Sequence, residues 1–292
     1  MRPVRDFLDF RFNDMGFEMK LRKALEKAKM MREGSSPPVS AQGRPVVITR
    51  SPEKEWKPPV YSESQEMQVE PAELFGNRLV CIEPDAVELE SYKVLRTRIQ
   101  QAAKIKHMNT FMITSPNPGD GKTLTAINLS LTYAKAYNHT VLLVDCDLRM
   151  QNVHQMLGLD SAAGLVDFLV DDKPLNEFII WPGIENMTLI SGGRSIQNSA
   201  ELLSSERMKS LVQELKARYS DRVVIIDAPP LLSGADALAL APLVDCILMV
   251  VKEDQTRMAD IRTALEMIPR EKFLGFILNS QRKNGKNYYY YK

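Results

Sequence analysis

The segment from Ser115 to Thr123 has the residue types and the spacing of a loop that binds phosphate groups. Glycines let backbone N–H groups approach phosphate oxygens, a lysine meets the charges of the β- and γ-phosphates, and a hydroxyl can ligate Mg²⁺. Pro116 stands where such loops usually have their first glycine, so the alternative is a Gly/Pro surface turn before a helix. The complete predicted nucleotide-binding stretch is Pro118, Gly119, Asp120, Gly121, Lys122, Thr123 and Leu124.

Three aspartates follow apolar runs that have the composition of buried strands. Asp145 and Asp147 follow the run 141–144, and Asp227 follows the run 223–226. Side chains alternate between the two faces of a strand, so Asp145 and Asp147 are expected to project to the same side. Acids at the carboxyl ends of parallel strands lie where open α/β sheets bind ligands. Each acid alone could be a loop or cap residue, but three of them after a phosphate loop predict a metal–nucleotide site.

The segments around these motifs alternate between strand and helix patterns. Strands are predicted at 110–114, 140–145, 187–191, 222–227, 245–251 and 273–278. Helices are predicted over 85–103 and 124–137, with further helical segments between most of the strands. This alternation is typical of an α/β fold with a mostly parallel sheet flanked by helices on both faces. The phosphate loop would then join a strand to the start of a helix, which is the context that such a motif requires.

Four adjacent tyrosines, Tyr288, Tyr289, Tyr290 and Tyr291, lie next to the last residue of the sequence. The residues from Gln281 onward are otherwise Arg, Lys, Asn and Gly, so we predict a mobile tail. In isolation, the tyrosines could be the end of a strand or an aromatic tag that binds a partner. Beside a predicted nucleotide site, they indicate hydroxyl groups that can accept phosphate.

Length and charge exclude several classes of protein. The 292 residues suffice for one α/β domain of about 200 residues with extensions. The formal net charge of +1 gives no reason to expect nucleic acid as a partner. Three cysteines without paired spacing and three scattered histidines argue against disulfides and against a metal cluster. Without an apolar run of membrane-spanning length or a signal-peptide pattern, the predicted location is cytoplasmic.

Changes in composition divide the chain into four predicted parts. Residues 1–33 combine a phenylalanine-rich start with a basic amphipathic stretch, which predicts a segment that docks on a partner or on the inner face of the membrane. The alternative is a helix that folds back onto the main domain. Residues 34–78 are rich in Pro, Ser and Glu and are predicted to be a linker, so that the N-terminal extension is partly disordered. The compact domain would span 79–280 and the tail 281–292.

Taken together, the motifs resemble those of one protein family. The stretch 118–123, the Asp-x-Asp-x-Arg pattern that begins at Asp145 and the Ile-Asp-Ala-Pro-Pro pattern around Asp227 are similar to the three Walker-type motifs of the bacterial tyrosine kinases (BY-kinases). The tyrosine-rich tail also resembles that of the family, whose members are autokinases of capsule and exopolysaccharide production. The resemblance covers the chain from about Leu79 onward and implies a P-loop NTPase-like fold.

Two further positions relate to this resemblance. The segment 198–203 is similar to a family segment ahead of a helix, and Ser199 stands where proline is commoner. Arg149 ends the Asp-x-Asp-x-Arg pattern; it could stabilise the site or a neighbouring tail, or it could be only a residue at the entry to a helix.

The resemblance implies transfer of phosphate from ATP, with Mg²⁺, to the four tail tyrosines. Lys122 is predicted to meet the β- and γ-phosphates and Thr123 to ligate Mg²⁺. Asp147 and Asp227 would hold the ion directly or through water. Asp145 would orient the tyrosine hydroxyl and accept its proton, because a phenol with a pKa of about 10 needs only modest help at neutral pH.

The resemblance also implies partners. Family members carry a Glu-x-x-Arg-x-x-Arg helix that joins subunits into a ring, and the corresponding residues here are Glu90, Lys93 and Arg96. Lysine lacks the planar fork of arginine, and the alternative is an ordinary solvated charge pattern on a helix. A separate membrane protein that controls polysaccharide chain length is expected as the activator, and a phosphotyrosine phosphatase as the opposing enzyme.

Two other functions fit part of the sequence. Nucleotide-switch ATPases of the partition and division-site type share the fold, but they carry a signature lysine where this chain has Asn117 and they lack a terminal tyrosine run. A non-catalytic ATP-binding subunit of a polysaccharide assembly would use most of the same binding residues. Formation of phosphotyrosine in the presence of ATP and Mg²⁺ separates these functions from a kinase.

Overall fold

The computed structural model describes the main domain and a short N-terminal strand. The described residues are 5–7, 64–70, 74, 76–83, 86–136, 139–160, 163–171, 173–217 and 222–280. The tyrosine tail, the predicted docking segment apart from Arg5–Phe7, and most of the predicted linker lie outside these residues. The predictions for those parts therefore stay predictions.

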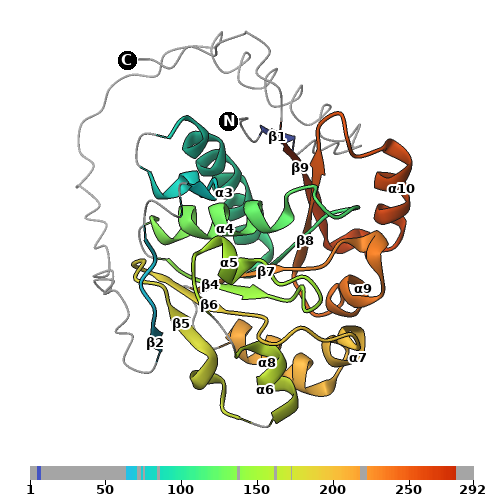
Figure 1. Cartoon of the computed structure of the whole chain (residues 1–292). Helices are drawn as coiled ribbons and strands as arrows, with labels where there is room; N and C mark the ends of the chain where they lie inside the picture. Colours follow the sequence, from blue (N-terminus) through green and yellow to red (C-terminus); the bar gives the residue numbers. More distant parts are fainter. Residues whose placement is uncertain are drawn as a thin grey trace, which may run out of the picture. The chain divides into compact units, whose positions relative to one another are not determined.

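A nine-stranded sheet forms the centre of the domain, in the order β1-β9-β8-β3-β7-β4-β6-β5-β2 (Figure 1). The strands are β1 Arg5–Phe7, β2 Gln65–Glu66, β3 Thr110–Thr114, β4 Thr140–Asp145, β5 Ile179–Trp181, β6 Met187–Ile190, β7 Arg222–Asp227, β8 Cys246–Lys252 and β9 Phe273–Asn279. All strands from β9 to β6 in this order pair in parallel. Towards the edges, β1 is antiparallel to β9, β5 is antiparallel to β6, and β2 is parallel to β5. The prediction of a mostly parallel sheet is confirmed.

The strands that the sequence predicts are present with nearly the same bounds. Those at 110–114, 140–145 and 222–227 coincide with β3, β4 and β7, and the other predicted strands differ by a residue or two at their ends. The short strands β1, β2 and β5 were not predicted. Each has two or three residues, and such a segment becomes a strand only because a neighbouring strand offers its hydrogen-bonding edge.

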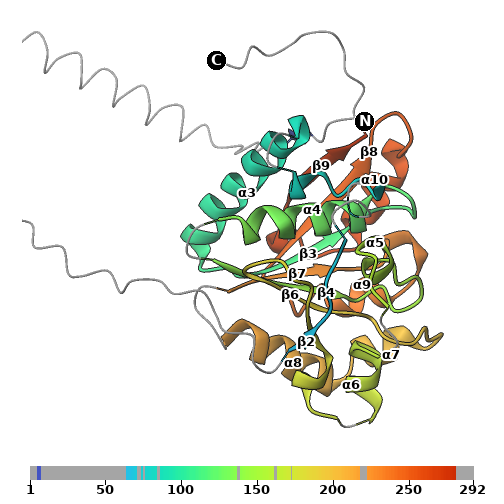
Figure 2. The same ribbon diagram turned by 60° about the vertical axis from the view of Figure 1, so that its left-hand side comes forward.

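Helices cover both faces of the sheet, as predicted. The helices are α3 Val87–Lys106, α4 Lys122–Ala134, α5 Val153–Met156, α6 Leu165–Asp171, α7 Ser199–Leu203, α8 Glu206–Ala217, α9 Asp236–Leu240 and α10 Met258–Glu266. Short 3-10 turns lie at Val80–Ile82, Leu175–Phe178, Leu231–Ser233 and Arg270–Lys272. Figure 2 shows α3 and α4 on one side of the sheet and α6 and α8 on the other.

The central strands are apolar on both faces because two separate cores flank the sheet. In β3, Phe111 and Ile113 pack into the core with α3 and α4, whereas Met112 between them packs into the core with α6, α8 and α9. In β4, Leu143 and Leu142 divide between the two cores in the same way. Strands buried on both faces read as continuous apolar runs, and this explains why they were easily recognised. No helix among the described residues is long and apolar enough to cross a membrane.

Candidate active site

The phosphate loop joins the end of β3 to the first residue of α4, as its sequence predicts. Gly119 has a φ of 81° and Gly121 a φ of 99°, and both values lie in the left-handed region that favours glycine. A Cβ atom at Gly121 would also lie 1.9 Å from Nδ2 of Asn279, so the side chain of Asn279 would have to move. Helix α4 starts at Lys122, so its unpaired N–H groups and the positive end of its dipole lie at the loop.

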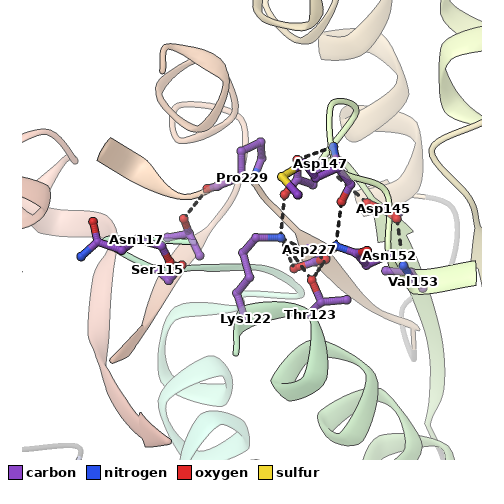
Figure 3. A network of polar contacts seen from close by, with 12 residues as sticks. Ser115, Asn117, Lys122, Thr123, Asp145, Asp147, Asn152, Val153, Asp227 and Pro229 are labelled. Carbon is purple, nitrogen blue, oxygen red and sulfur yellow. Dashed lines mark hydrogen bonds and ion pairs between the residues drawn. The ribbon is translucent and has the colours of Figure 1, made fainter. Parts of the chain in front are cut away.

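The lysine, the threonine and two of the predicted acids meet directly at this loop (Figure 3). The Nζ atom of Lys122 lies 2.8 Å from Oδ2 of Asp147 and 3.5 Å from the nearer carboxylate oxygen of Asp227. The hydroxyl of Thr123 donates a hydrogen bond of 2.6 Å to Oδ2 of Asp227. These side chains come from α4, from the loop after β4 and from the end of β7, and all four are buried.

Asp145 is buried behind this group and supports it. It lies opposite Asp227 in the register of β4 and β7. Its two carboxylate oxygens accept backbone N–H groups, one from Asp147 at 3.1 Å and one from Val153 at 3.2 Å. Asp145 therefore holds the loop that carries Asp147, a task that the sequence did not indicate.

The charges in the site are unbalanced towards the negative side. Burial, and after it the neighbouring carboxylate of Asp227, raise the pKa of Asp145 to about 8. Burial also raises the pKa of Asp227. For Lys122, burial lowers the pKa, but the carboxylates of Asp227 and Asp147 outweigh it, so the pKa lies above the ordinary value. One ammonium group thus faces three acids, which suits a site that also receives a divalent cation.

The oxygen atoms present fit Mg²⁺. The hydroxyl of Thr123 and the carboxylates of Asp147 and Asp227 are the hard oxygen ligands that this ion prefers. Among the described residues, no group of three or more His, Cys, Asp or Glu side chains is arranged to hold a metal ion by itself. Mg²⁺ bound here would therefore take much of its coordination from phosphate oxygens and water, as it commonly does.

Two polar residues that the sequence did not single out, Thr256 and Asn279, form hydrogen bonds with Asp120 of the phosphate loop. The hydroxyl of Thr256 donates to Oδ1 of Asp120 at 2.7 Å, and the side-chain amide of Asn279 donates to the backbone carbonyl of Asp120 at 2.8 Å. Asn117, at the position of the switch ATPases' signature lysine, donates from Nδ2 to Asp260 of α10 at 3.0 Å. The available signal for Asn279 was its place at the end of the apolar run 273–278, on the edge of the sheet where ligands bind.

A pocket of about 430 Å³ lies beside the phosphate loop and is large enough for part of a nucleotide. Its walls come from the start of α4, the end of β9, the segment after β8 and the α3 region. The lining residues are Arg78, Val80, Glu88, Tyr92, Leu124, Asn128, Lys252, Gln255, Asn279 and Ser280.

The predicted assembly residues lie on α3, away from the convergent acids. Lys93 and Glu90 form an exposed ion pair of 2.5 Å within the helix, which is the solvated pattern considered as the alternative. Nη1 of Arg96 donates to the backbone carbonyl of Thr132 on α4 at 2.6 Å. The predicted phosphorylation sites lie outside the described residues, so their position relative to the acids is not defined.

Comparison with known proteins places this site in a family. Residues 108–272 match the family model described as an AAA domain. The chain is 33% identical over 217 residues to the tyrosine-protein kinase YwqD of Bacillus subtilis; the match spans 74% of this chain and 90% of YwqD. The chain belongs to the bacterial tyrosine kinase family. The enzyme class of this kinase is protein-tyrosine kinase, and its P-loop NTPase-like fold is one that binds nucleotides.

Other relatives of the kinase differ in length. It is 31% identical over 214 residues to the tyrosine-protein kinase Wzc of Salmonella typhimurium, and this match covers 72% of the chain but 29% of Wzc. Among solved structures, the chimerical protein CapA2B2 matches with a TM-score of 0.66 and 27% identity, over 77% of this chain and 96% of that one. The kinase domain of Escherichia coli ETK has a TM-score of 0.67 at 24% identity, covering 80% of this chain and 95% of that one, which supports the fold.

Proposed function

We propose that this kinase is an autokinase that transfers the γ-phosphoryl group of ATP, with Mg²⁺, to its own tail tyrosines Tyr288–Tyr291 in a neighbouring subunit. The observation that carries the proposal is the meeting of Lys122, Thr123, Asp147 and Asp227 at the phosphate loop. A tyrosine cluster in the same chain supplies the acceptor. By analogy with its named relatives, we further propose that the reaction regulates the synthesis and export of an exopolysaccharide or capsule.

The chain's own residues would share the work of the transfer. The tyrosine oxygen would attack the γ-phosphorus, the bond from that phosphorus to the β–γ bridging oxygen would break, and ADP would leave. Lys122 would neutralise charge on the β- and γ-phosphates, which is the main requirement of a loose transition state. Mg²⁺, held by Thr123, Asp147 and Asp227, would supply further positive charge at the phosphates.

We propose Asp145 as the acceptor of the tyrosine proton. Asp145 lies opposite Asp227 in the register of β4 and β7, at the sheet edge that the acceptor hydroxyl would have to reach, and a carboxylate positioned there can accept a proton in the transition state. The proton would then pass to solvent as the phosphorylated tyrosine leaves. Because Asp145 also holds the loop of Asp147, its removal would impair both the proton transfer and the position of a metal ligand.

The direct test is to incubate the purified chain with ATP and Mg²⁺ and to measure phosphotyrosine by mass spectrometry. An autokinase accumulates phosphate on tyrosine. A nucleotide switch would release phosphate without labelling tyrosine, and a non-catalytic subunit would bind ATP without doing either. Either of the last two results would refute the proposal.

We propose a homo-oligomer, in the form of a ring, in which α3 contributes Glu90, Lys93 and Arg96 to the contact between subunits. If so, Glu90→Ala combined with Lys93→Ala should shift the unmodified protein towards the monomer and slow phosphorylation at low protein concentration. These two residues are preferable to Arg96 as a first test, because Arg96 also bonds to Thr132 within the chain. Light scattering measures the mass, and Lys209→Ala with Glu206→Ala, the same kind of exposed pair on α8, is the control. A monomer that phosphorylates itself at a concentration-independent rate would refute transfer between subunits.

We propose that residues 1–33 recruit the kinase, otherwise cytoplasmic, to the inner face of the membrane, where a membrane regulator of polysaccharide chain length would activate it. Deleting residues 2–33 should leave ATP affinity within about twofold while the fraction of kinase in membrane pellets falls severalfold. Within the described part of this segment, β1 pairs with Phe276–Leu278 of β9. A truncated protein that unfolds or loses ATP binding would show that the segment belongs to the domain instead.

We also propose that a phosphotyrosine phosphatase removes phosphate from the tail tyrosines.

A further inference from the structure

A polar network outside the phosphate site holds the arginine that ends the Asp-x-Asp-x-Arg pattern. The Nε atom of Arg149 donates to the hydroxyl oxygen of Ser199 at 2.9 Å, and its Nη2 atom lies 3.1 Å from Oδ2 of Asp236. The hydroxyl of Ser199 in turn donates to Oδ1 of Asp236. Ser199 and Asp236 are buried, so both partners of the arginine are fixed by packing.

The network fixes the guanidinium group without enclosing it. Ser199 is the first residue of α7 and Asp236 the first residue of α9, so the arginine is held by two different helices. Its side chain nevertheless remains 47% exposed. A guanidinium group has five N–H donors, and the contacts with Ser199 and Asp236 use only two of them. A planar guanidinium group held in place in this way can form bidentate hydrogen bonds with a phosphate.

The backbone of Arg149 lies close to Asp147, at the proposed transfer site. The backbone N–H of Met150 bonds to the carbonyl of Asp147 at 3.1 Å, which closes a turn with Arg149 inside it. The Cα atoms of residues i and i+2 are at most about 7 Å apart, so the Cα atom of Arg149 lies within about 7 Å of that of Asp147. The segment after β6 borders this turn, since the hydroxyl of Ser195 donates to the carbonyl of Arg149 at 3.2 Å.

An extended peptide can present two side chains to this part of the surface at once. Side chains two residues apart project to the same side and are separated by roughly 7 Å. In a run of adjacent tyrosines, therefore, the second neighbour of the acceptor tyrosine projects to the same side as the acceptor, just as Arg149 follows Asp147 by two residues. The unmodified tail carries Arg282, Lys283 and Lys286, which a guanidinium group does not attract, whereas each phosphate adds up to about −2.

We propose that Arg149, positioned by Ser199 and Asp236, is a binding subsite for a phosphotyrosine that lies two positions from the acceptor tyrosine. The first phosphate on a tail would then favour transfer to further tyrosines of the same tail. This inference rests on the proposed tail phosphorylation and adds an order to it. Ser199 is central to it, because its hydroxyl contacts both Arg149 and Asp236.

The test compares two peptides as acceptors. One has the sequence of residues 281–292, and the other has the same sequence with phosphotyrosine at the position of Tyr290. The enzyme is the full chain with Tyr288–Tyr291 changed to phenylalanine, so that only the peptide is labelled. The quantity measured is the ratio of kcat/KM for transfer to Tyr288 of the phosphorylated peptide over transfer to Tyr288 of the plain peptide. We expect a ratio of about ten, which corresponds to one charge-assisted contact with phosphate.

The variants separate recognition from a merely structural role. Arg149→Gln should bring the ratio to about one, and Arg149→Lys should also lower it because lysine lacks the fork. Ser199→Ala should give an intermediate ratio. Arg194→Gln is the matched control, since Arg194 is likewise about half exposed, at 52%, and pairs with two acids, Asp167 and Asp171 of α6. Loss of structure would lower transfer to both peptides equally and leave the ratio unchanged.

Two outcomes would overturn the inference and are distinct from failure of the proposed function. A ratio of one in the enzyme with native Arg149 would show that the enzyme does not recognise a phosphotyrosine beside the acceptor. A ratio of ten that persists in Arg149→Gln would show that another residue recognises the phosphotyrosine. If neither peptide is labelled and the unsubstituted chain forms no phosphotyrosine while binding ATP, it is the proposed tail phosphorylation that fails.

Discussion

Replacing Lys122 by methionine is expected to abolish autophosphorylation, with a fall in rate of at least about 10³-fold. Lys122 is the cation that lies between Asp147 and Asp227 at the phosphate loop. Methionine keeps a similar length but removes the charge that would stabilise the transferring phosphoryl group, and such contacts are commonly worth several kcal/mol. Phosphate incorporation per chain, measured with ATP and Mg²⁺, gives the rate.

Loss of the ammonium group also leaves two buried carboxylates without their counter-charge, so stability has to be measured beside activity. Lys209→Met, on the exposed face of α8, is a suitable control for the change of residue type. Asp227→Asn and Asp145→Asn are expected to lower the rate by several orders of magnitude with less effect on folding. Phosphotyrosine that persists in Lys122→Met, Asp145→Asn and Asp227→Asn would refute the proposed kinase mechanism.

Changing Tyr288, Tyr289, Tyr290 and Tyr291 together to phenylalanine is expected to remove most phosphate incorporation, by about tenfold or more. Phenylalanine keeps the aromatic ring and removes only the hydroxyl that accepts phosphate. The phosphate loop is untouched, so ATP affinity should stay within about twofold of its original value, and calorimetry with ATP and Mg²⁺ can measure it.

The structure sharpens this test, because it shows which other tyrosines are inaccessible. Tyr92 and Tyr133 are each 1% exposed in the core with α3 and α4, so neither can enter a neighbouring active site while the domain is folded. Peptide mapping of the labelled chain identifies the acceptors. Label that stays mainly on Tyr92, Tyr133 or Tyr219 after the four substitutions would show that the tail is not the substrate.

Local patterns in the sequence determined much of this protein. The central strands were predicted because burial on both faces makes each of them a continuous apolar run. The phosphate loop was predicted because Gly119 and Gly121 meet a backbone requirement that few other residues can meet. The meeting of Asp147 and Asp227 at Lys122 followed from one rule, that the carboxyl ends of parallel strands share an edge of the sheet.

Tertiary structure alone decided the features that depend on residues far apart in the chain. Asn279 contacts Asp120 only because β9 ends beside the phosphate loop, and no spacing in the sequence encodes this. The task of Asp145 in holding the loop after β4 depends on how that loop folds back onto the strand end. Arg149 and Asp236 are distant in the sequence and are joined by a serine from a third segment. Such contacts arise from the packing of whole elements, whereas periodicity and turn chemistry report only on neighbours along the chain.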